Sequence, residues 1–430
     1  MNDDSATRGA AADAIRRYWP MIYAPTALFS MGEGAIVPVL PMIATDLGAT
    51  LAAAALVAAC LIVGQLCGNL PAGLLVERAG ERRAMVVASI IALVGVAAMY
   101  AAPHLAVLGI ATFLIGMCAA VFHIARHTFM TARVPYSHRA RALALVGGSF
   151  RLGAFTGPAI AAGLIWWTGQ DRSTIIFFGV CLVGVGLLVA FGPDPEEKAL
   201  AAEREARARG VDHGFADTGE PITGGIPTGA RAGLFRTMWD HRVVLARLGV
   251  AGAMLSAVRT GRQTILPLWG LSIGLDSANV ALIIGLAGAI EFSLFYASGQ
   301  VMDRFGRVWT TVPAQFLMGA SFLALSLTHE LTTASMWFGA LAIAVGVGNG
   351  LSSGALLTLG SDLAPRANTP QFLGAWRTIT DCGGAGAPLL VSAVTALATL
   401  SVATGAVGMI GVLGGLAFLR WVPRFLPHPR

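Results

Sequence analysis

The sequence predicts an all-α membrane protein with 12 transmembrane helices. Of its 430 residues, 56% are hydrophobic and 12% are charged, whereas soluble domains contain about 25% charged residues. A helix needs about 20 apolar residues to cross the hydrocarbon core of a bilayer, and twelve runs reach that length. These runs cover approximately residues 20–44, 51–75, 84–102, 106–133, 141–167, 174–192, 243–269, 278–301, 309–328, 334–361, 371–397 and 401–421.

The loops between these runs alternate in charge. One set, at 46–50, 102–105, 168–173, 270–277, 328–333 and 397–401, contains a single cationic residue, Arg172. The other loops and the two terminal segments carry clusters of arginine. Because cytoplasmic loops are enriched in Lys and Arg, we expect a multi-pass protein of the cell (plasma) membrane with both termini in the cytoplasm. This bias also explains the net charge of +6, so no nucleic-acid partner is expected.

The order of the runs predicts two six-helix halves joined by one long loop. The halves are residues 1–192 and 241–430, and residues 193–240 form a cytoplasmic linker rich in charge, glycine and proline. Landmarks recur at nearly one offset: 226 residues separate Glu77 from Asp303 and also Arg151 from Arg377. Paired halves of this kind place the substrate near the bilayer midplane.

Two short charged loops share the pattern Gly-x-x-x-acid-Arg-x-Gly. The first runs from Gly73 to Arg83 and the second from Gly299 to Arg307. Glycine permits close backbone approach, the acid suits a helix N-terminus, and arginine bridges to acids or phosphates. We interpret both loops as parts of a cytoplasmic gate, with Asp362 as a partner for Arg304; two unrelated basic turns are the alternative. The gate residues are Gly73, Glu77, Arg78, Gly80, Gly299, Asp303, Arg304, Gly306 and Asp362.

With these loops the chain resembles the Major Facilitator Superfamily. The resemblance implies the MFS fold, two pseudo-symmetric six-helix bundles in which helices 3, 6, 9 and 12 are peripheral and the others line a central cavity. Gly153-x-x-x-Gly157-Pro158 in helix 5 resembles the signature of the 12-helix drug/proton antiporter subfamily. Two features depart from that subfamily: Ala161-Ala162 replace a glycine pair, and Thr112 stands where helix 4 often has arginine.

Eight charged residues fall deep inside the predicted spans. Charges at this depth are costly and usually face a cavity or a partner. We expect three acids to be candidates for proton coupling: Glu33, Glu291 and Asp381. Glu33 is the leading candidate, with a structural ion pair or direct substrate contact as alternatives. Five arginines are candidate substrate ligands: Arg126, Arg151, Arg259, Arg262 and Arg377.

Several of these charges can neutralise one another. Arg377 and Asp381 are four residues apart on one helical face. The resemblance places helix 5 beside helix 8, so Arg151 is expected to reach Glu291. Glu33 is expected to reach Arg126 or Arg262. The remaining arginines predict a positive excess in the cavity.

Other candidate ligands are His123, His127 and Trp376. The two histidines lie one turn apart, but without an evident third ligand we interpret them as cavity lining or packing, not as a metal site. Trp376 is a candidate for stacking on an aromatic substrate. The five cysteines lie in apolar runs and are interpreted as small buried hydrophobic residues. No metal and no cofactor are expected.

These features predict a monomeric secondary transporter and not an enzyme. The expected activity is proton-coupled export (antiport) of amphipathic or drug-like small molecules by alternating access, with protons and membrane lipids as the other partners. Uptake of an organic anion and translocation of a lipid through a lateral opening are the alternatives, and a receptor without transport activity is a third. An ATP-driven pump is disfavoured because the sequence has no Gly-x-x-x-x-Gly-Lys-Ser/Thr motif.

Overall fold

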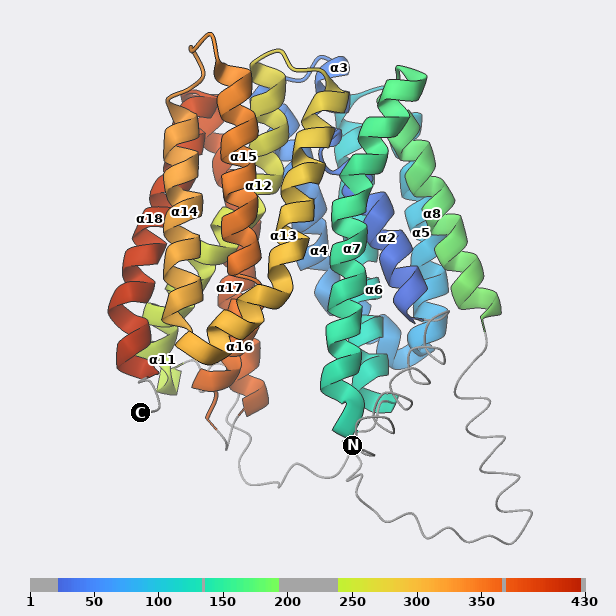
Figure 1. The fold of residues 1–430 in the computed structure, drawn as a ribbon. Coiled ribbons are helices and arrows are strands. Elements are labelled where there is room, and N and C mark those ends of the chain that lie inside the picture. The colour runs from blue at the N-terminus through green and yellow to red at the C-terminus, as the bar shows by residue number, and fades with distance from the viewer. Residues whose placement is uncertain (1–21, 134–135, 193–238, 366–368, 427–430) are drawn as a thin grey trace, which may run out of the picture.

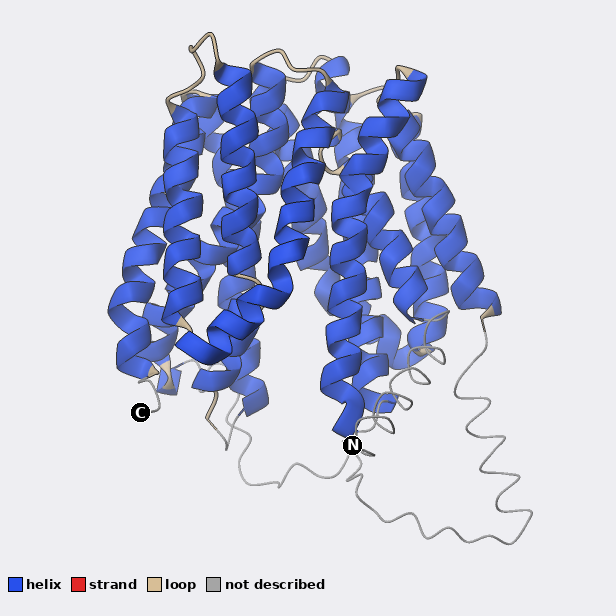
Figure 2. Cartoon of the chain, in the orientation of Figure 1, coloured by secondary structure: helices blue, strands red, loops and turns tan. Residues whose placement is uncertain are grey.

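A computed structural model describes residues 22–133, 136–192, 239–365 and 369–426, and all regular structure in these ranges is helical (Figure 2). The predicted linker lies almost entirely outside them. The first bundle contains α2 (Ala24–Ile36), α3 (Leu40–Asp46), α4 (Leu51–Ala79), α5 (Glu81–Tyr100), α6 (Leu105–Arg133), α7 (Tyr136–Thr168) and α8 (Ser173–Phe191). The second contains α11 (Arg242–Val244), η2 (Leu245–Gly249), α12 (Val250–Ser272), α13 (Ser277–Phe305), α14 (Val308–Ser326), α15 (Ala334–Leu351), α16 (Ala355–Leu363), α17 (Thr369–Leu397) and α18 (Leu400–Phe425) (Figure 1).

The described helices account for the predicted spans. Ten of them are long and apolar enough to cross a membrane, and α2 and α3 together, bent by 40°, make an eleventh. The remaining long helix, α7, has 33 residues. Two runs predicted as single helices are broken. The break after α2 contains Pro38, which has no N–H for a helical hydrogen bond, and the break before α16 contains Gly354 at φ +78°.

The helix contacts repeat between the two bundles. In the first, α2 packs on α7 and α8, while α4 and α5 pack on α6. In the second, α12 packs on α17 and α18, while α13 and α14 pack on α15. These equivalent contacts show that the two bundles have the same internal arrangement, as the repeated landmarks predicted.

The bundles meet along two helix pairs, α7 with α13 and α4 with α17. We use "inner end" for the end of the molecule where α2 begins and α18 ends, and "outer end" for the opposite end. Ser277 Oγ donates to Asp171 Oδ2 at 2.7 Å across the outer end, and Ser392 Oγ donates to the Ala52 carbonyl at 2.9 Å. Towards the inner end, α7 and α13 diverge (Figure 1). The structure is therefore closed between the bundles at its outer end.

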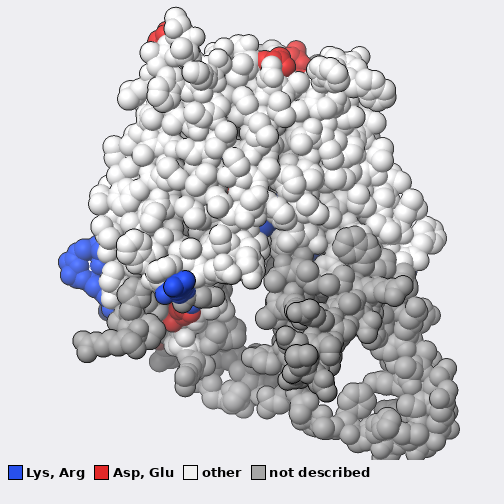
Figure 3. Space-filling model, viewed as in Figure 1, with Lys and Arg blue, Asp and Glu red and all other residues white. Residues whose placement is uncertain are grey.

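Charged side chains gather at the two ends of the described surface (Figure 3). Asp46, Asp171 and Asp276 lie where helices begin or end at the outer end, whereas Arg78, Arg83 and Arg304 lie at the inner end. The uncharged band between them fits a bilayer. All five cysteines are free, but Cys67 and Cys382 are exposed, contrary to the prediction, because a thiol is small and apolar enough for a lipid-facing as well as a packed position.

Candidate functional site

A cavity of about 380 Å³ lies between the two bundles. Its lining comes from α2, α4, α6 and α7 on one side and from α12, α13, α15 and α16 on the other. The helices α5, α8, α14 and α18 contribute no residue to it, in agreement with the expected peripheral position of helices 3, 6, 9 and 12, but α17, the predicted helix 11, contributes none either, contrary to the prediction. The polar lining residues are Ser30, Glu33, Gln65, His123, Arg151, Ser256, Arg259, Thr260, Arg262, Gln263, Glu291 and Asn349.

Close packing of α7 on α2 positions the first part of this lining. A Cβ atom on Gly153 would lie 2.5 Å from the Ala27 carbonyl oxygen, and one on Gly157 would lie 2.5 Å from that of Met31. Any larger residue would therefore push the helices apart. The Gly153-x-x-x-Gly157 motif thus brings Glu33 on α2 and Arg151 on α7 to the same cavity.

The first polar cluster, which we call the Glu33 pole, contains Glu33, Gln65 and Arg126. Gln65 Nε2 donates to Glu33 Oε1 at 3.0 Å, and Arg126 interacts with Glu33 electrostatically. Arg126 is only 4% exposed and lies behind the lining rather than in it. Its Nε donates to the Phe122 carbonyl at 2.8 Å, while its Nη1 has no hydrogen-bond partner among the described residues. Glu33 therefore faces the cavity with one neutral donor and one cation beside it.

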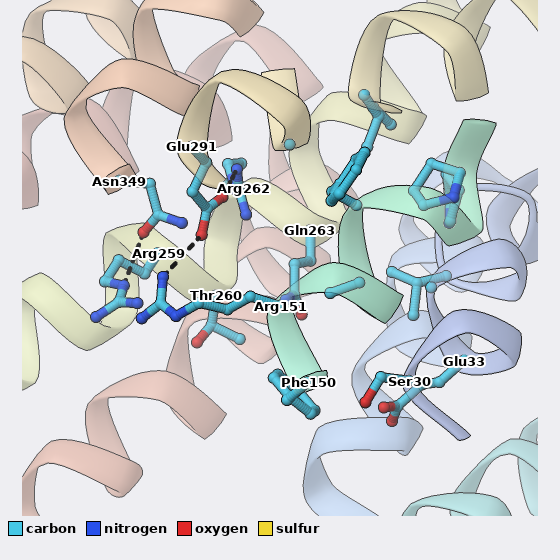
Figure 4. A pocket seen from close by; sticks show the side chains of 18 of the residues that line it. Ser30, Glu33, Phe150, Arg151, Arg259, Thr260, Arg262, Gln263, Glu291 and Asn349 are labelled. Atoms are coloured by element: carbon cyan, nitrogen blue, oxygen red, sulfur yellow. Dashed lines mark hydrogen bonds and ion pairs between the residues drawn. The ribbon is translucent and has the colours of Figure 1, made fainter. Parts of the chain in front are cut away.

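The second cluster, the Glu291 pole, is richer in positive charge. Glu291 Oε2 lies 2.9 Å from Arg262 Nη1, and Glu291 Oε1 lies 3.8 Å from Arg151 Nη1. Because Arg151 belongs to the first bundle, the second pair bridges the bundles, as expected. Asn349 hydrogen-bonds to Glu291 and also accepts from Arg259 Nε at 2.7 Å. Figure 4 shows Arg259, Glu291 and Asn349 on one side, Glu33 and Ser30 on the other, and Arg151 between them.

The Glu291 pole has three arginines and one carboxylate. Arg259 has no carboxylate oxygen within 4.0 Å among the described residues, and Asn349 is the partner that orients it. Arg151 is held by a hydrogen bond of 2.7 Å to Ser353 Oγ and stacks on Phe295, with its Cζ 4.3 Å from the ring centroid. This arrangement leaves the predicted positive excess at the cavity wall.

Apolar rings lie next to both poles. Phe155 and Phe292 line the cavity from different bundles, with their centroids 5.3 Å apart. Phe150 also lines it and contacts the His123 ring edge-on at a centroid distance of 5.5 Å. The cavity therefore offers charged groups together with aromatic surface.

Three candidate residues on α17 do not line the cavity. Arg377 and Asp381 form the expected intrahelical pair, with Nε and Oδ2 3.5 Å apart, but their side chains are 63% and 42% exposed. Trp376 is buried, and its indole N–H donates to the Leu356 carbonyl at 3.0 Å. Sequence position fixes depth along a helix, whereas membership of the cavity wall depends also on how the helix packs. The side chain of His127 lies outside the described part.

The two signature loops occupy equivalent positions at the inner end. Gly80 ends α4 at φ +79° and Gly306 ends α13 at φ +91°. Residues with a Cβ rarely adopt these angles, which accounts for the last glycine of each motif. The first glycines behave differently from our expectation, since a Cβ on Gly73 or Gly299 would meet nothing within 4 Å.

The expected pairing of Asp362 with Arg304 is corrected by the structure. Asp362 Oδ2 lies 2.8 Å from Arg307 Nε, and Arg307 Nη1 also donates to the Met302 carbonyl at 2.9 Å. The Arg304 guanidinium lies 5.4 Å from the Phe305 ring centroid instead. The turn at Gly306 directs Arg307 towards α16. Glu77 and Arg78 are exposed at the same end, and the side chain of Asp303 is outside the described part.

Sequence reasoning missed the neutral amides Gln65 and Asn349, which hold the two acids. Each is an amide inside a largely apolar span, Gln65 with a second amide, Asn69, four residues later, and this signal was available. It also missed Arg82, whose guanidinium donates to the carbonyls of Val189, Ala190 and Gly192 at 2.9, 2.6 and 3.1 Å. Arg82 thereby binds the last carbonyls of α8 and fixes the first signature loop to that helix.

Comparisons with known proteins support the observed architecture. The model of the Major Facilitator Superfamily matches residues 24–388. A search of curated proteins gave no match. Many solved structures share the fold.

Three examples each have 13% sequence identity to the chain. The first is a D-xylose–proton symporter, with a TM-score of 0.69 over 95% of this chain and 98% of the other. The second is a POT family transporter in complex with 5-aminolevulinic acid, with a TM-score of 0.70 over 94% of this chain and 96% of the other. The third is a bacterial homolog of the human lysosomal transporter Spinster in an inward-facing, unoccupied conformation, with a TM-score of 0.70 over 95% of this chain and 98% of the other. At this identity they establish the fold only.

Proposed function

The chain belongs to the Major Facilitator Superfamily of membrane transporters, and from this premise we propose that it exports amphipathic or drug-like compounds bearing a negative charge in exchange for protons. The observation that carries this proposal is the pairing of two unlike poles in one cavity. Glu33 faces the cavity beside one neutral donor and one arginine, whereas the Glu291 pole has three arginines and one carboxylate.

Glu33 is the proposed proton carrier. A carboxyl group can exchange its proton for interaction with a nearby cation when access to water changes. Gln65 can remain hydrogen-bonded to either form of Glu33 because an amide has both donors and an acceptor. Glu291 is less suited to this role, since its arginines stabilise the ionised carboxylate. Asp381, the third candidate, does not line the cavity.

The Glu291 pole is the proposed anchor for the substrate. Guanidinium groups bind carboxylates, phosphonates and sulfonates through paired charge-assisted hydrogen bonds. Arg259 is the best placed, because it lines the cavity and no described carboxylate pairs with it. Phe150, Phe155 and Phe292 would contact the apolar part of the same molecule.

Alternating access is the proposed mechanism, and the signature loops are the proposed inner gate. The outer contact between Asp171 and Ser277 and the divergence of α7 from α13 support assignment of this structure to the state open at the inner end. The arginines at the inner end support a cytoplasmic location for that end. In this scheme residues 1–192 and 241–430 rock as a monomer around residues 193–240, and no chemical conversion of the substrate occurs.

Proton-coupled uptake of a small organic anion is the second candidate. The positive excess of the Glu291 pole favours it directly, since such a wall suits any small carboxylate. Two structures of similar fold are named as a proton symporter and as a complex with 5-aminolevulinic acid.

Transport by purified protein in liposomes that contain a pH-sensitive dye tests both candidates. Amphipathic anions and matched cations would be added under an imposed proton gradient. Antiport predicts that the anions move against their gradient while protons move in the opposite direction, and that the matched cations are not transported. Movement of both in the same direction would replace export with uptake, and equal transport of the cations would refute the role of the arginines.

Glu33→Gln separates coupling from binding. We expect this variant to lose proton-driven accumulation while it retains exchange of labelled for unlabelled substrate without a gradient. Glu330→Gln is the matched control, because Glu330 is exposed at the outer end beside His329. Unchanged proton-driven transport by Glu33→Gln would remove Glu33 from the mechanism.

A further inference from the structure

We propose that the inner end of α18 binds an anionic phospholipid, a function separate from the central cavity. Three arginines surround a single indole there. The guanidinium carbons of Arg247, Arg420 and Arg424 lie 4.2, 5.1 and 5.3 Å from the ring centroid of Trp421. Arg247 comes from η2 and the other three residues from α18, so two elements build the cluster. Figure 3 shows Lys and Arg side chains on the flank of the molecule where α18 reaches the inner end.

Among the described residues, no carboxylate compensates the charge of the cluster. Arg247, Arg420 and Arg424 are all exposed, and none of them forms an ion pair with another described residue. The face of Trp421 attracts each guanidinium, but it does not neutralise their mutual repulsion. Three like charges around one ring therefore create a local positive potential that an anion would relieve.

The depth of the cluster matches that of lipid phosphates. α18 contains 26 residues, which corresponds to about 39 Å of helix, whereas the hydrocarbon core is about 30 Å thick. Arg420 follows the first residue of α18 by 20 positions, or about 30 Å along the axis. Its guanidinium and that of Arg424 therefore lie at the level of the head groups, where Trp421 is also favoured.

An apolar track leads along α18 to these arginines. Met409, Leu413 and Leu416 are 49%, 46% and 49% exposed, and their spacings of four and three residues keep them on one helical face. Arg420 and Arg424 continue the same face at intervals of four. Leu416, Ala417, Leu419, Arg420 and Trp421 form an open surface site at the junction.

This order of groups corresponds to the parts of a phospholipid. An acyl chain can lie along Met409, Leu413 and Leu416, while its phosphate accepts hydrogen bonds from Arg420 and its neighbours. A free phosphate would use only the arginines, and a neutral lipid would use mainly the track. The combination favours a lipid with net negative charge.

Native mass spectrometry of the purified full chain in detergent tests the proposal. Phosphatidylglycerol would be compared with phosphatidylcholine of the same acyl chains, and the expected result is saturable binding of phosphatidylglycerol only. Arg420→Ala/Arg424→Ala should bind it about 30-fold more weakly. The control Arg78→Ala/Arg83→Ala removes the same charge at the same end. It should stay within about two-fold of the unaltered protein, because those residues belong to α4 and α5 of the other bundle and not to the cluster.

A second variant tests the track separately from the charge. Leu413→Ala/Leu416→Ala keeps the arginines and should also weaken phosphatidylglycerol binding, while leaving that of glycerol phosphate unchanged. The proposal is overturned if phosphatidylcholine binds equally well, if glycerol phosphate without acyl chains binds as tightly as the lipid, or if the control double variant loses as much affinity as Arg420→Ala/Arg424→Ala. The lipid comparisons use the unaltered protein and do not depend on the folding of any variant.

Discussion

Glu33 and Glu291 face one cavity from different bundles, and they differ in what holds them. Glu33 has Gln65 at 3.0 Å and the electrostatic influence of Arg126. Glu291 has Arg262 at 2.9 Å, Arg151 at 3.8 Å and a hydrogen bond from Asn349. The two bundles repeat the same helix contacts, so this difference arises from side chains and not from the fold.

The difference indicates how a duplicated scaffold can divide two tasks. Removal of the charge on Glu33 leaves one buried arginine without its counter-ion, whereas removal of the charge on Glu291 leaves three arginines facing one another. The first change is compatible with a working cycle. The second would disrupt the wall itself, which suits Glu291 to a permanent structural charge.

Stability measurements on the two amide variants provide the strongest test of this contrast. We expect Glu291→Gln to lower the free energy of unfolding by about 3 kcal/mol, because breaking a buried pair leaves uncompensated charge. Glu33→Gln should cost less, about 1.5 kcal/mol, since only one arginine loses its counter-ion and the new amide can still bond to Gln65. Thermal or denaturant unfolding in detergent measures both, and equal losses would contradict the assignment of different tasks.

Two arginines of the Glu291 pole should separate binding from structure. Arg259→Met removes a guanidinium that has no carboxylate partner among the described residues, so we expect about 30-fold weaker substrate binding, equivalent to about 2 kcal/mol, with little change in stability. Arg262→Met should lower stability by about 2 kcal/mol, because Glu291 loses its closest cation. Ligand-induced thermal shifts and unfolding curves give the two quantities. If both variants behaved alike, Arg259 would be a structural residue.

The two neutral amides sharpen the comparison on a smaller scale. Asn349→Leu should cost about 2 kcal/mol, because it removes a hydrogen bond from each of two charged groups, Arg259 and Glu291. Gln65→Leu should cost about 1 kcal/mol, since only Glu33 loses a partner. Unfolding in detergent distinguishes them, and a larger loss for Gln65→Leu would reverse the ranking of the poles.

The smallest effect on stability is expected at the contact between Asp171 and Ser277, which joins the two bundles at the outer end. Burial raises the pKa of Asp171, and the neighbouring Asp46 and Asp276 raise it further, while the hydrogen bond from Ser277 opposes them. Because the pKa of Asp171 is raised in the folded protein, the protonated carboxyl favours the folded state. This contribution to the free energy of unfolding is complete below the ordinary pKa of about 4 and is lost as pH rises through the raised value. Asp171→Asn should therefore show a flatter dependence of melting temperature on pH above 4, with a difference of less than about 1 kcal/mol for this partly exposed group. A parallel dependence in both proteins would exclude this effect.

Much of the architecture was predictable because it depends on short sequence motifs. The two Gly-x-x-x-acid-Arg-x-Gly loops predicted equivalent hairpins, and Gly80 and Gly306 end α4 and α13 at equivalent positive angles. The contact of Arg151 with Glu291 followed from the expected proximity of helices 5 and 8. The first prediction followed from the residues of the loops, whereas the second also needed the helix order that the family resemblance implies.

Errors arose where the outcome depends on the rotation of a helix or the direction of a turn. Arg377 and Asp381 form the expected pair in α17, but they are not among the residues that line the cavity. Asp362 reaches Arg307 and not Arg304 because the two arginines flank the turn at Gly306. The importance of Asn349 depended on its distance to Arg259, 90 residues earlier in the chain, which spacing alone does not reveal.

The open space beside Gly73 and Gly299 affects how substitutions at these positions should be judged. Alanine would fit there without a clash in this structure, so substitution at either position should leave the melting temperature of the protein almost unchanged. Turnover requires every state of the cycle, and a side chain harmless in one state can prevent the approach of neighbours in another. We therefore expect alanine variants at these two glycines to fold normally, so that only a transport measurement can show whether the space narrows in another state.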